Sequence, residues 1–220
     1  IHDCGAGDGQ TGCGRDPSGG TDRQDSCKCT IIDGMKPLPV CKKEQEEDSV
    51  SIEKVKDFFA QYGMEHRIRE FDVSSATVEL AAAALNCEPC RIAKTLSFMV
   101  GSTPVLVVAA GDAKVDNRKF KERFGTKANM LRPEETVSVI GHAVGGICPF
   151  AVNEGVEVYL DVSLKRFDTV FPACGSSNSA IELTIAELEQ YSSFLSWVDV
   201  CKGWEEPSGQ LANDLQAQSQ

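Results

Sequence analysis

The fold of this 220-residue chain can be predicted outward from the segment Thr95-Leu96-Ser97-Phe98-Met99-Val100-Gly101-Ser102-Thr103-Pro104-Val105-Leu106-Val107-Val108-Ala109-Ala110. Two apolar runs, 95–100 and 105–110, flank a short stretch that contains glycine and proline, and this pattern is typical of a β-hairpin. Neither run approaches the roughly 18 apolar residues that a membrane span requires. The segment therefore predicts two paired strands in a soluble protein without membrane contact.

Helical periodicity is found on both sides of this hairpin. Apolar residues at helical spacing predict a helix from Ser51 to about Gly63. The other predicted helices are 77–85 capped by Ser74 or Ser75, Asn117–Phe124 closed by Gly125, one from Pro133 to Gly141, and one capped by Thr184 that runs to Tyr191. Further strands are expected at 66–71, 156–160, 169–171 and 181–183. Strands and helices that do not strictly alternate indicate a mixed sheet in the α/β (mixed α+β) class.

The two ends of the chain differ in composition from its centre. Residues 1–34 contain eight glycines and almost no aliphatic residue before Ile31, so they cannot bury enough surface to offset the entropy of ordering. We expect a disordered head and linker over 1–49, with Met35 as an alternative native start, a folded domain over 50–201 and a loose tail over 202–220. No basic and apolar leader is visible, which favours a cytoplasmic location.

Ten cysteines are spread over both halves of the chain. Only Cys87 and Cys90 form a Cys-x-x-Cys pair, and no second pair completes a tetrahedral zinc site. The cysteines of the folded domain are expected to be small buried apolar residues, and they are Cys87, Cys90, Cys148, Cys174 and Cys201. The sequence therefore predicts no metal.

The formal net charge of −11 argues against a protein that coats DNA or other nucleic acid without specificity. The segment 112–132 has the opposite sign, because seven basic residues less three acidic ones give +4. Two interpretations of this segment stay open, a solvated helix face and a surface that contacts RNA.

Two local features could carry chemistry. In the segment 141–150, the adjacent Gly145 and Gly146 and the nearby Pro149 allow a tight loop whose main-chain N–H groups could hold an oxyanion or a carbonyl oxygen. An ordinary turn is the alternative. Lys94 stands where a turn leads into a strand, so its side chain either reaches outward to solvent or presents a cation to a phosphate. No Gly-x-x-x-x-Gly-Lys element surrounds it, which excludes a nucleotide-binding P-loop.

Together these segments resemble the YbaK/EbsC superfamily, and within it the ProX-like deacylases. The resemblance covers about residues 50–201. It rests on Lys94-Thr95, Gly111-Asp112, the Gly145–Pro149 loop, Phe171-Pro172-Ala173-Cys174-Gly175-Ser176 and Ile181-Glu182-Leu183, which occur in the family's order. These proteins are free-standing relatives of the editing domain of bacterial prolyl-tRNA synthetases. The resemblance implies a curved mixed sheet flanked by helices, the editing-domain fold.

The resemblance also implies a function. Members hydrolyse the ester of an amino acid wrongly attached to tRNA, typically tRNA(Pro), without a cofactor, and prolyl-tRNA synthetase is an expected partner. Lys94, Gly145 and Gly146 match the catalytic positions. The implied substrate contacts are Phe71, Thr95, Gly111, Asp112, Ile147, Cys148, Pro149, Cys174 and Gly175, and the expected tRNA contacts are Lys114, Arg118, Lys119, Lys121 and Arg123. Phe71 and Ala180 replace a tyrosine and an aspartate of some Cys-tRNA deacylases, which argues against cysteine as the amino acid removed.

Two other functions are compatible with the sequence. A cysteine hydrolase could use Cys148 or Cys174 with His142, which lies in the same loop as Cys148. For His142 the alternative is a hydrogen-bonded or surface histidine. A non-catalytic module that binds aminoacyl-tRNA or a synthetase is the second candidate.

Overall fold

A β-hairpin forms the middle of the sheet in the structure, a computed structural model that describes residues 42–204. Strand β2 (Ile92–Val100) runs antiparallel to β3 (Thr103–Ala110), and Ala93 stands opposite Ala110. Gly101 lies in the turn with a φ of +62°, a conformation that favours glycine. The hairpin predicted from the sequence is therefore confirmed.

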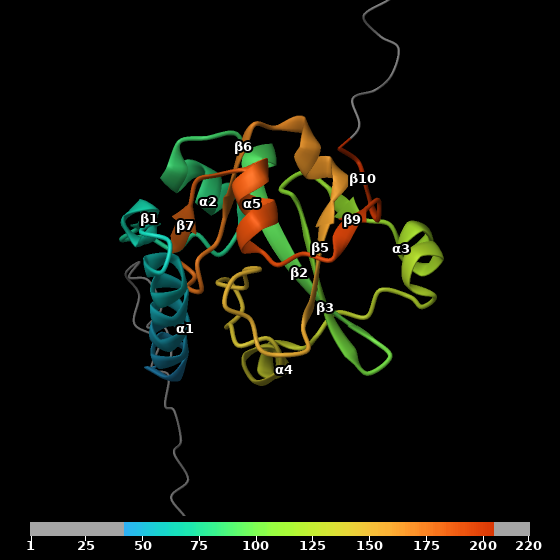
Figure 1. Ribbon diagram of the computed structural model, residues 1–220, viewed down its shortest axis with the longest axis horizontal. Coiled ribbons are helices and arrows are strands. Elements are labelled where there is room, and N and C mark those ends of the chain that lie inside the picture. Colours follow the sequence, from blue (N-terminus) through green and yellow to red (C-terminus); the bar gives the residue numbers. More distant parts are fainter. Residues whose placement is uncertain (1–41, 205–220) are drawn as a thin grey trace, which may run out of the picture. The chain divides into compact units, whose positions relative to one another are not determined.

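The hairpin belongs to a six-stranded mixed sheet. The strand order is β8 (Leu183–Thr184), β6 (Thr169–Pro172), β2, β3, β5 (Glu157–Asp161) and β9 (Ser196–Val198). Strand β6 is parallel to β2, β5 to β3 and β9 to β5, whereas β2–β3 and β6–β8 are antiparallel. Two short antiparallel pairs accompany this sheet: β1 (Ile68–Glu70) with β7 (Ser179–Ile181), and β4 (Lys114–Val115) with β10 (Cys201–Lys202). The predicted mixed sheet of the α/β class is confirmed (Figure 1).

The helices follow the sequence pattern closely in the second half of the domain. They are α1 (Lys42–Ala60), α2 (Val78–Leu85), α3 (Asn117–Phe124), α4 (Pro133–Val139) and α5 (Ile185–Tyr191), with short 3-10 turns η1 (Glu65–Arg67), η2 (Pro89–Arg91) and η3 (Val162–Arg166). Gly125 ends α3 at a φ of +76°, and Thr184 forms the predicted capping box with Glu187. No helix within 42–204 combines the length and apolar character needed to cross a membrane.

Several predicted boundaries are wrong. Helix α1 begins at Lys42 instead of Ser51, because residues of high helix propensity extend it into a stretch expected as a linker. Thr77 caps α2 in place of Ser74 or Ser75, since its hydroxyl accepts the N–H of Leu80. The strand expected at 66–71 begins with the turn η1, and the one at 181–183 is two separate strands, β7 and β8. The expectations for 1–41 and 205–220 lie outside the described residues.

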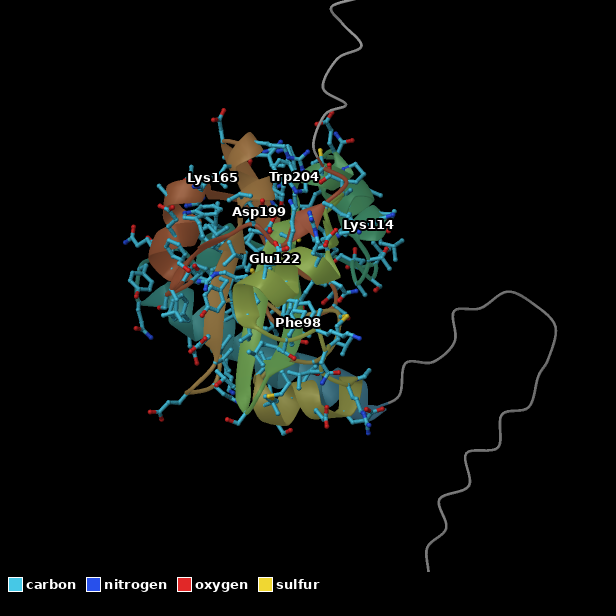
Figure 2. All side chains as sticks on the ribbon, turned by 90° about the vertical axis from the view of Figure 1, so that its right-hand side faces the viewer. Phe98, Lys114, Glu122, Lys165, Asp199 and Trp204 are labelled. Carbon is cyan, nitrogen blue, oxygen red and sulfur yellow. The ribbon has the colours of Figure 1, made fainter. Side chains whose placement is uncertain are left out.

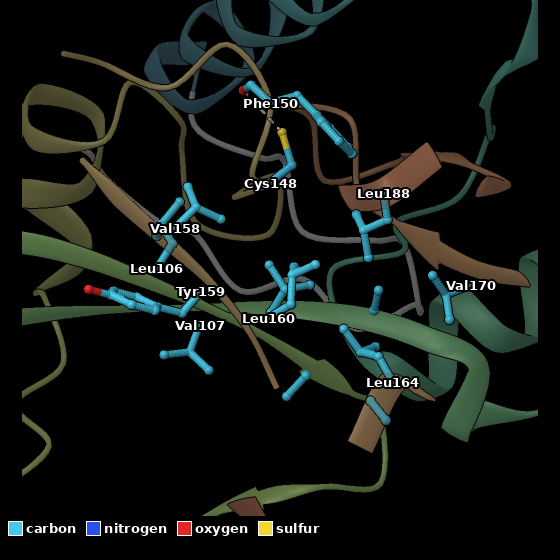
Figure 3. Packing of buried hydrophobic residues seen from close by; sticks show 14 of the residues in the cluster. Leu106, Val107, Cys148, Phe150, Val158, Tyr159, Leu160, Leu164, Val170 and Leu188 are labelled. Atoms are coloured by element: carbon cyan, nitrogen blue, oxygen red, sulfur yellow. Dashed lines mark hydrogen bonds between the residues drawn. The ribbon is translucent and has the colours of Figure 1, made fainter. Parts of the chain in front are cut away.

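The core fills both faces of the sheet. From Val105 to Ala110 every side chain of β3 is at most 1% exposed. Figure 3 shows that Leu106, Val158 and Leu160 point to the side on which Cys148 and Phe150 lie, whereas Val107 and Tyr159 point to the other side. On that other side α3 packs through Phe120, whose ring centroid lies 4.8 Å from that of Phe98. The sheet therefore separates the 141–150 loop from the basic helix α3.

A buried carboxylate joins three parts of the domain at the end of β5. Asp161 is completely buried and accepts the main-chain N–H groups of Ser163 at 3.0 Å and Val200 at 2.9 Å. The hydroxyl of Ser163 in turn accepts the N–H of Ala110, at the end of β3, at 3.1 Å. Asp161 and Ser163 thus fix η3 to the end of the hairpin.

We expect Asp161→Ala to lower the free energy of unfolding by about 3 kcal/mol, because two buried N–H groups lose a charged acceptor. Asp199→Ala, in an exposed ion pair with Lys119, should stay within about 1 kcal/mol of wild type. Urea unfolding of both variants checks this difference. Equal losses would contradict the anchoring role of Asp161.

Candidate active site

A cleft of about 610 Å³ opens along the outer edge of β2, and we call it the β2 cleft. Its floor is β2 from Ile92 to Ser97. Its walls are formed by the start of α2, the segment leading into α4, the loop after α4, and β6 with β7. The wall residues are Ser75, Ala76, Thr77, Val78, Ala81, Met130, Leu131, Pro133, Thr136, Val144, Gly145, Ile147, Phe171, Ala173, Ser179 and Ala180.

The cleft exists because the described residues pair with the outer edge of β2 at both ends but not in the middle. Strand β6 pairs only with Ile92 and Ala93. Farther along, the N–H of Met99 donates to the carbonyl of Asn129, and the carbonyl of Ser97 accepts the N–H of Leu131. Main-chain groups alternate in direction along a strand, so those of Thr95 face the same edge as those of Ser97. No described strand pairs with Thr95 on that side.

Lys94 is held at the edge of this gap. Its ammonium donates to the carbonyl of Gly111 at 2.9 Å, and its side chain is partly buried. Burial lowers the pKa of Lys94, while the nearby Cys201, Asp112 and Glu79 act in the opposite direction. The side chain thus does not simply extend into solvent, and it presents a fixed cation beside the cleft.

The loop after α4 approaches Lys94 from across the cleft. Gly145 and Ile147 line the cleft, and Gly145 has a φ of +95°. Gly146 lies against a second loop instead: the N–H of Gly175 donates to its carbonyl at 3.1 Å, and a Cβ on Gly146 would lie 2.5 Å from the carbonyl carbon of Gly175. Gly146 is therefore required for the close approach of two main-chain segments.

The thiols behind this loop are buried. Cys148 and Cys174 are 0% exposed, and burial raises the pKa of Cys148 to about 12 and that of Cys174 well above its usual value. Cys148 Sγ lies 3.6 Å from Nε2 of His142, which donates to the carbonyl of Phe150 at 2.8 Å. A buried thiol of raised pKa is a poor nucleophile, because the thiolate is the reactive form. His142 is a buried, hydrogen-bonded histidine and not a surface one.

The structure brings only part of the predicted set into one place. Lys94, Thr95, Gly145 and Ile147 line the cleft, and Gly111 contacts Lys94. Gly146, which was predicted to be catalytic, does not line the cleft. The predicted substrate contacts that do not line it are Phe71, Asp112, Cys148, Pro149, Cys174 and Gly175. Phe71 pairs through its main chain with Asn178. Among the described residues, no three His, Cys, Asp or Glu side chains gather as a metal site would require.

Sequence reasoning missed several wall residues. Met130, Leu131 and Thr136 reach the cleft because the chain between α3 and α4 pairs with the edge of β2. Ala76, just before α2, and Ser179, in β7, also line the cleft. These are ordinary residue types without a motif, so only their contacts distant in sequence reveal them.

The basic residues expected to contact tRNA differ in whether their charges are already bound by other groups of the protein. Lys119 donates to Asp199 at 2.7 Å and to the carbonyl of Cys201 at 3.0 Å. Arg118 lies 4.0 Å from Glu122, and Arg123 donates to the hydroxyl of Ser196 at 3.1 Å. Lys114 and Lys121 are exposed and form no ion pair within the described part of the chain. Figure 2 shows this side of the molecule, on which Lys114, Glu122 and Asp199 are labelled.

Comparison with known proteins identifies the class. Residues 73–191 match the family model of the aminoacyl-tRNA editing domain, and the chain belongs to this family. It is 54% identical over 157 residues to the uncharacterized protein YwhH of Bacillus subtilis. The matched region covers 71% of this chain and all of that protein. It is also 26% identical over 138 residues to a proline–tRNA ligase of Streptococcus mutans, covering 60% of this chain but only 22% of the ligase.

Solved structures agree with this assignment. A crystal structure described as a candidate trans-editing enzyme for prolyl-tRNA synthetase superposes with a TM-score of 0.63 at 27% identity, covering 70% of this chain and 98% of that one. The hypothetical protein APE2540 superposes with a TM-score of 0.61 at 27% identity, covering 68% of this chain and 99% of that one. The editing-domain fold implied by the sequence motifs is therefore confirmed.

The buried His142 gives a pH dependence that can be measured. Burial lowers its pKa below the value of about 6.5 that it has in an unfolded chain, and no described residue offers an acceptor to the N–H that Nδ1 would carry in the charged form. Below about pH 6.5, the unfolded state therefore binds a proton at His142 more readily than the folded state does. The contribution of neutral His142 to stability is complete above this pH and is lost as the pH falls through the pKa of the folded state.

We expect the free energy of unfolding in urea to fall between about pH 7.5 and pH 5.5, a range in which carboxyl groups of ordinary pKa stay ionised. His142→Gln keeps a donor for the Phe150 carbonyl but does not titrate, so its stability should change less over the same range. An identical pH dependence of the two proteins would show that His142 does not fold in its neutral form.

Proposed function

We propose that this chain is an aminoacyl-tRNA deacylase that acts in trans and removes a wrongly attached amino acid, with tRNA(Pro) as the acceptor. The observation that carries the proposal is the meeting, in one cleft, of Lys94, the unpaired main chain at Thr95 and the turn at Gly145. Lys94 and Thr95 are neighbours in β2, whereas Gly145 comes from a loop that is distant in sequence, and each of the three offers a different kind of group to a substrate. Membership of the editing-domain family supports the same conclusion.

The chemistry needs no nucleophilic side chain. An aminoacyl ester is already reactive, and main-chain N–H groups at its carbonyl oxygen would stabilise the negative charge that develops when water attacks. The bond from the carbonyl carbon to the ribose oxygen then breaks, and the ribose oxygen takes up the proton. Lys94 would hold the terminal nucleotide through its ribose or phosphate oxygens. Orientation of the ester against these groups supplies the remainder of the acceleration.

The walls of the cleft restrict the amino acid. Among the described residues that line it, Lys94 has the one charged side chain, and Ala81, Ala93, Ala173 and Ala180 are small. An amino acid with a charged side chain would lose its hydration without gaining a partner. We therefore propose that the amino acid removed has a small, uncharged side chain.

A binding module that holds aminoacyl-tRNA without hydrolysing it would use the same cleft. The two functions differ in one measurement, the release of amino acid from mischarged tRNA(Pro) compared with buffer alone. Alanine, serine, threonine, cysteine and 2-aminobutyrate on the same tRNA make a panel that also tests the size limit. Release no faster than in buffer for the whole panel would favour the binding module.

Lys94→Ala should lower the rate of deacylation by about 10²-fold or more, because the substrate loses a fixed charged contact. Lys94→Arg should also be impaired, since the larger planar guanidinium does not replace a compact ammonium. Lys54→Ala, on the exposed surface of α1, is the matched control and should keep wild-type activity. Full activity in Lys94→Ala, with a melting temperature near wild type, would remove Lys94 from the site.

The cysteine hydrolase is tested at Cys148. Cys148→Ser and Cys148→Ala should each keep deacylation within about threefold of wild type once the folded fraction is accounted for, because a buried thiol of raised pKa supplies no nucleophile. Mass spectrometry of the quenched reaction should detect no acylated cysteine. Loss of turnover in both folded variants would establish the cysteine mechanism.

The basic surface is tested through salt. Lys114→Ala with Lys121→Ala should lower the slope of tRNA affinity against salt by up to about two, at roughly one unit for each phosphate that the protein no longer neutralises. The order of preference within the amino acid panel should not change. The double variant Lys54→Ala, Lys165→Ala is the control, because it removes the same number of positive charges from other parts of the surface. Its slope of tRNA affinity against salt should equal that of wild type. An unchanged slope in the Lys114 and Lys121 variant would show that this basic surface is only solvated and does not bind tRNA.

A further inference from the structure

The turn after β3 offers two acceptors to the ammonium of Lys94. One is the carbonyl of Gly111, which accepts it at 2.9 Å. The other is the carboxylate of the next residue, Asp112, whose negative charge raises the pKa of Lys94 but which accepts no hydrogen bond from Lys94 within the described part of the chain. Arg166 of η3 instead binds both carboxylate oxygens of Asp112, at 2.6 and 3.0 Å.

Arg166 is itself held from several directions. Its Nε donates to the carbonyl of Ser163 at 3.0 Å and its Nη1 to the carbonyl of Trp204 at 2.9 Å. Its guanidinium lies 4.8 Å from the ring centroid of Phe167 and 5.3 Å from that of Trp204. Because Ser163 is also bonded to Ala110, the same short turn fixes both the guanidinium and the end of β3.

Gly111 is equally constrained on its other side. Its N–H donates to the carbonyl of Cys90 at 3.3 Å. A Cβ at this position would overlap the carbonyl oxygen of Pro89, so only glycine lets the main chain lie here. The direction of the Gly111 carbonyl is therefore set by main-chain packing and does not depend on Lys94.

We propose that Arg166 is a positioning residue for deacylation, which binds Asp112 and thereby keeps this carboxylate from pairing with Lys94. A neutral carbonyl leaves the positive charge of Lys94 available to a phosphate or ribose oxygen of the substrate. A carboxylate would neutralise that charge and form a stronger, charge-assisted bond that the substrate must displace. The proposal rests on the proposed function, because it assigns Lys94 to the substrate.

The sharpest test compares Arg166→Gln with the double variant Arg166→Gln, Asp112→Asn. The single variant frees the carboxylate of Asp112 beside Lys94. Because the Lys94 ammonium is then misplaced, kcat/KM for mischarged tRNA(Pro) should fall by about tenfold or more. The double variant has no carboxylate at this position and should regain at least about threefold over the single variant, which reverses part of that loss. A merely structural salt bridge predicts no regain.

Arg67→Gln is the matched control. Arg67 also binds a carboxylate closely, that of Glu187 at 2.6 Å, and it is similarly exposed, but it does not line the cleft. Its activity per folded molecule should equal that of wild type. Equal loss of activity in Arg67→Gln and Arg166→Gln, or a double variant no better than Arg166→Gln, would overturn the proposal.

A second readout separates this proposal from the proposed function. The pKa of Lys94 can be measured by competitive acylation at several pH values with mass spectrometry of its peptide, without any tRNA. Cys201, Glu79 and Lys114 face Lys94 in all three proteins, so only Asp112 and Arg166 change. The pKa should rise in Arg166→Gln and return toward wild type in the double variant. An unchanged pKa overturns the positioning role, whereas absence of deacylation by wild type overturns the proposed function alone.

Discussion

Within residues 42–204, the outer edge of β2 has two different pairing partners and none between them, and the candidate site depends on this interruption. Strand β6 leaves the edge after Ala93, and the chain before α4 joins it only at Ser97. A strand paired along its whole length would have no main-chain groups to offer and no room beside them. The other walls of the cleft are segments that surround the space beside β2 which β6 does not occupy.

The alternation of side chains along β2 explains how two kinds of group meet at one point. Lys94 points to the face on which α3 and β10 lie, and its neighbour Thr95 points to the face of the 141–150 loop. The sheet edge is where both faces become accessible together. Close main-chain contacts hold the two sides of the site in place. Gly111 packs against Pro89 on one face, and Gly146 packs against Gly175 on the other. Glycine at these positions serves packing more than flexibility.

Local sequence patterns predicted the elements whose limits are set locally. The hairpin, α3 with Gly125 and the capping box at Thr184 all depend on residues a few positions apart. The short strands β4, β9 and β10 were not predicted, because each exists only through pairing with a distant segment. At the site, motifs singled out Lys94 and Gly145, and both line one cleft in the structure. They could not reveal that Asp112 is bound by Arg166, since no local pattern connects the two.

In the proposed deacylase, the ester lies between Lys94 and the turn at Gly145. A crystal structure with an amide-linked aminoacyl-adenosine, 3′-alanylamino-3′-deoxyadenosine, tests this placement most directly because the amide resists hydrolysis. We predict the nucleoside within hydrogen-bonding distance of the Lys94 ammonium and the amide carbonyl directed at main-chain N–H groups of the cleft. An analogue bound against the surface hollow between Glu79 and Arg91, with Lys94 still bonded only to Gly111, would contradict the account.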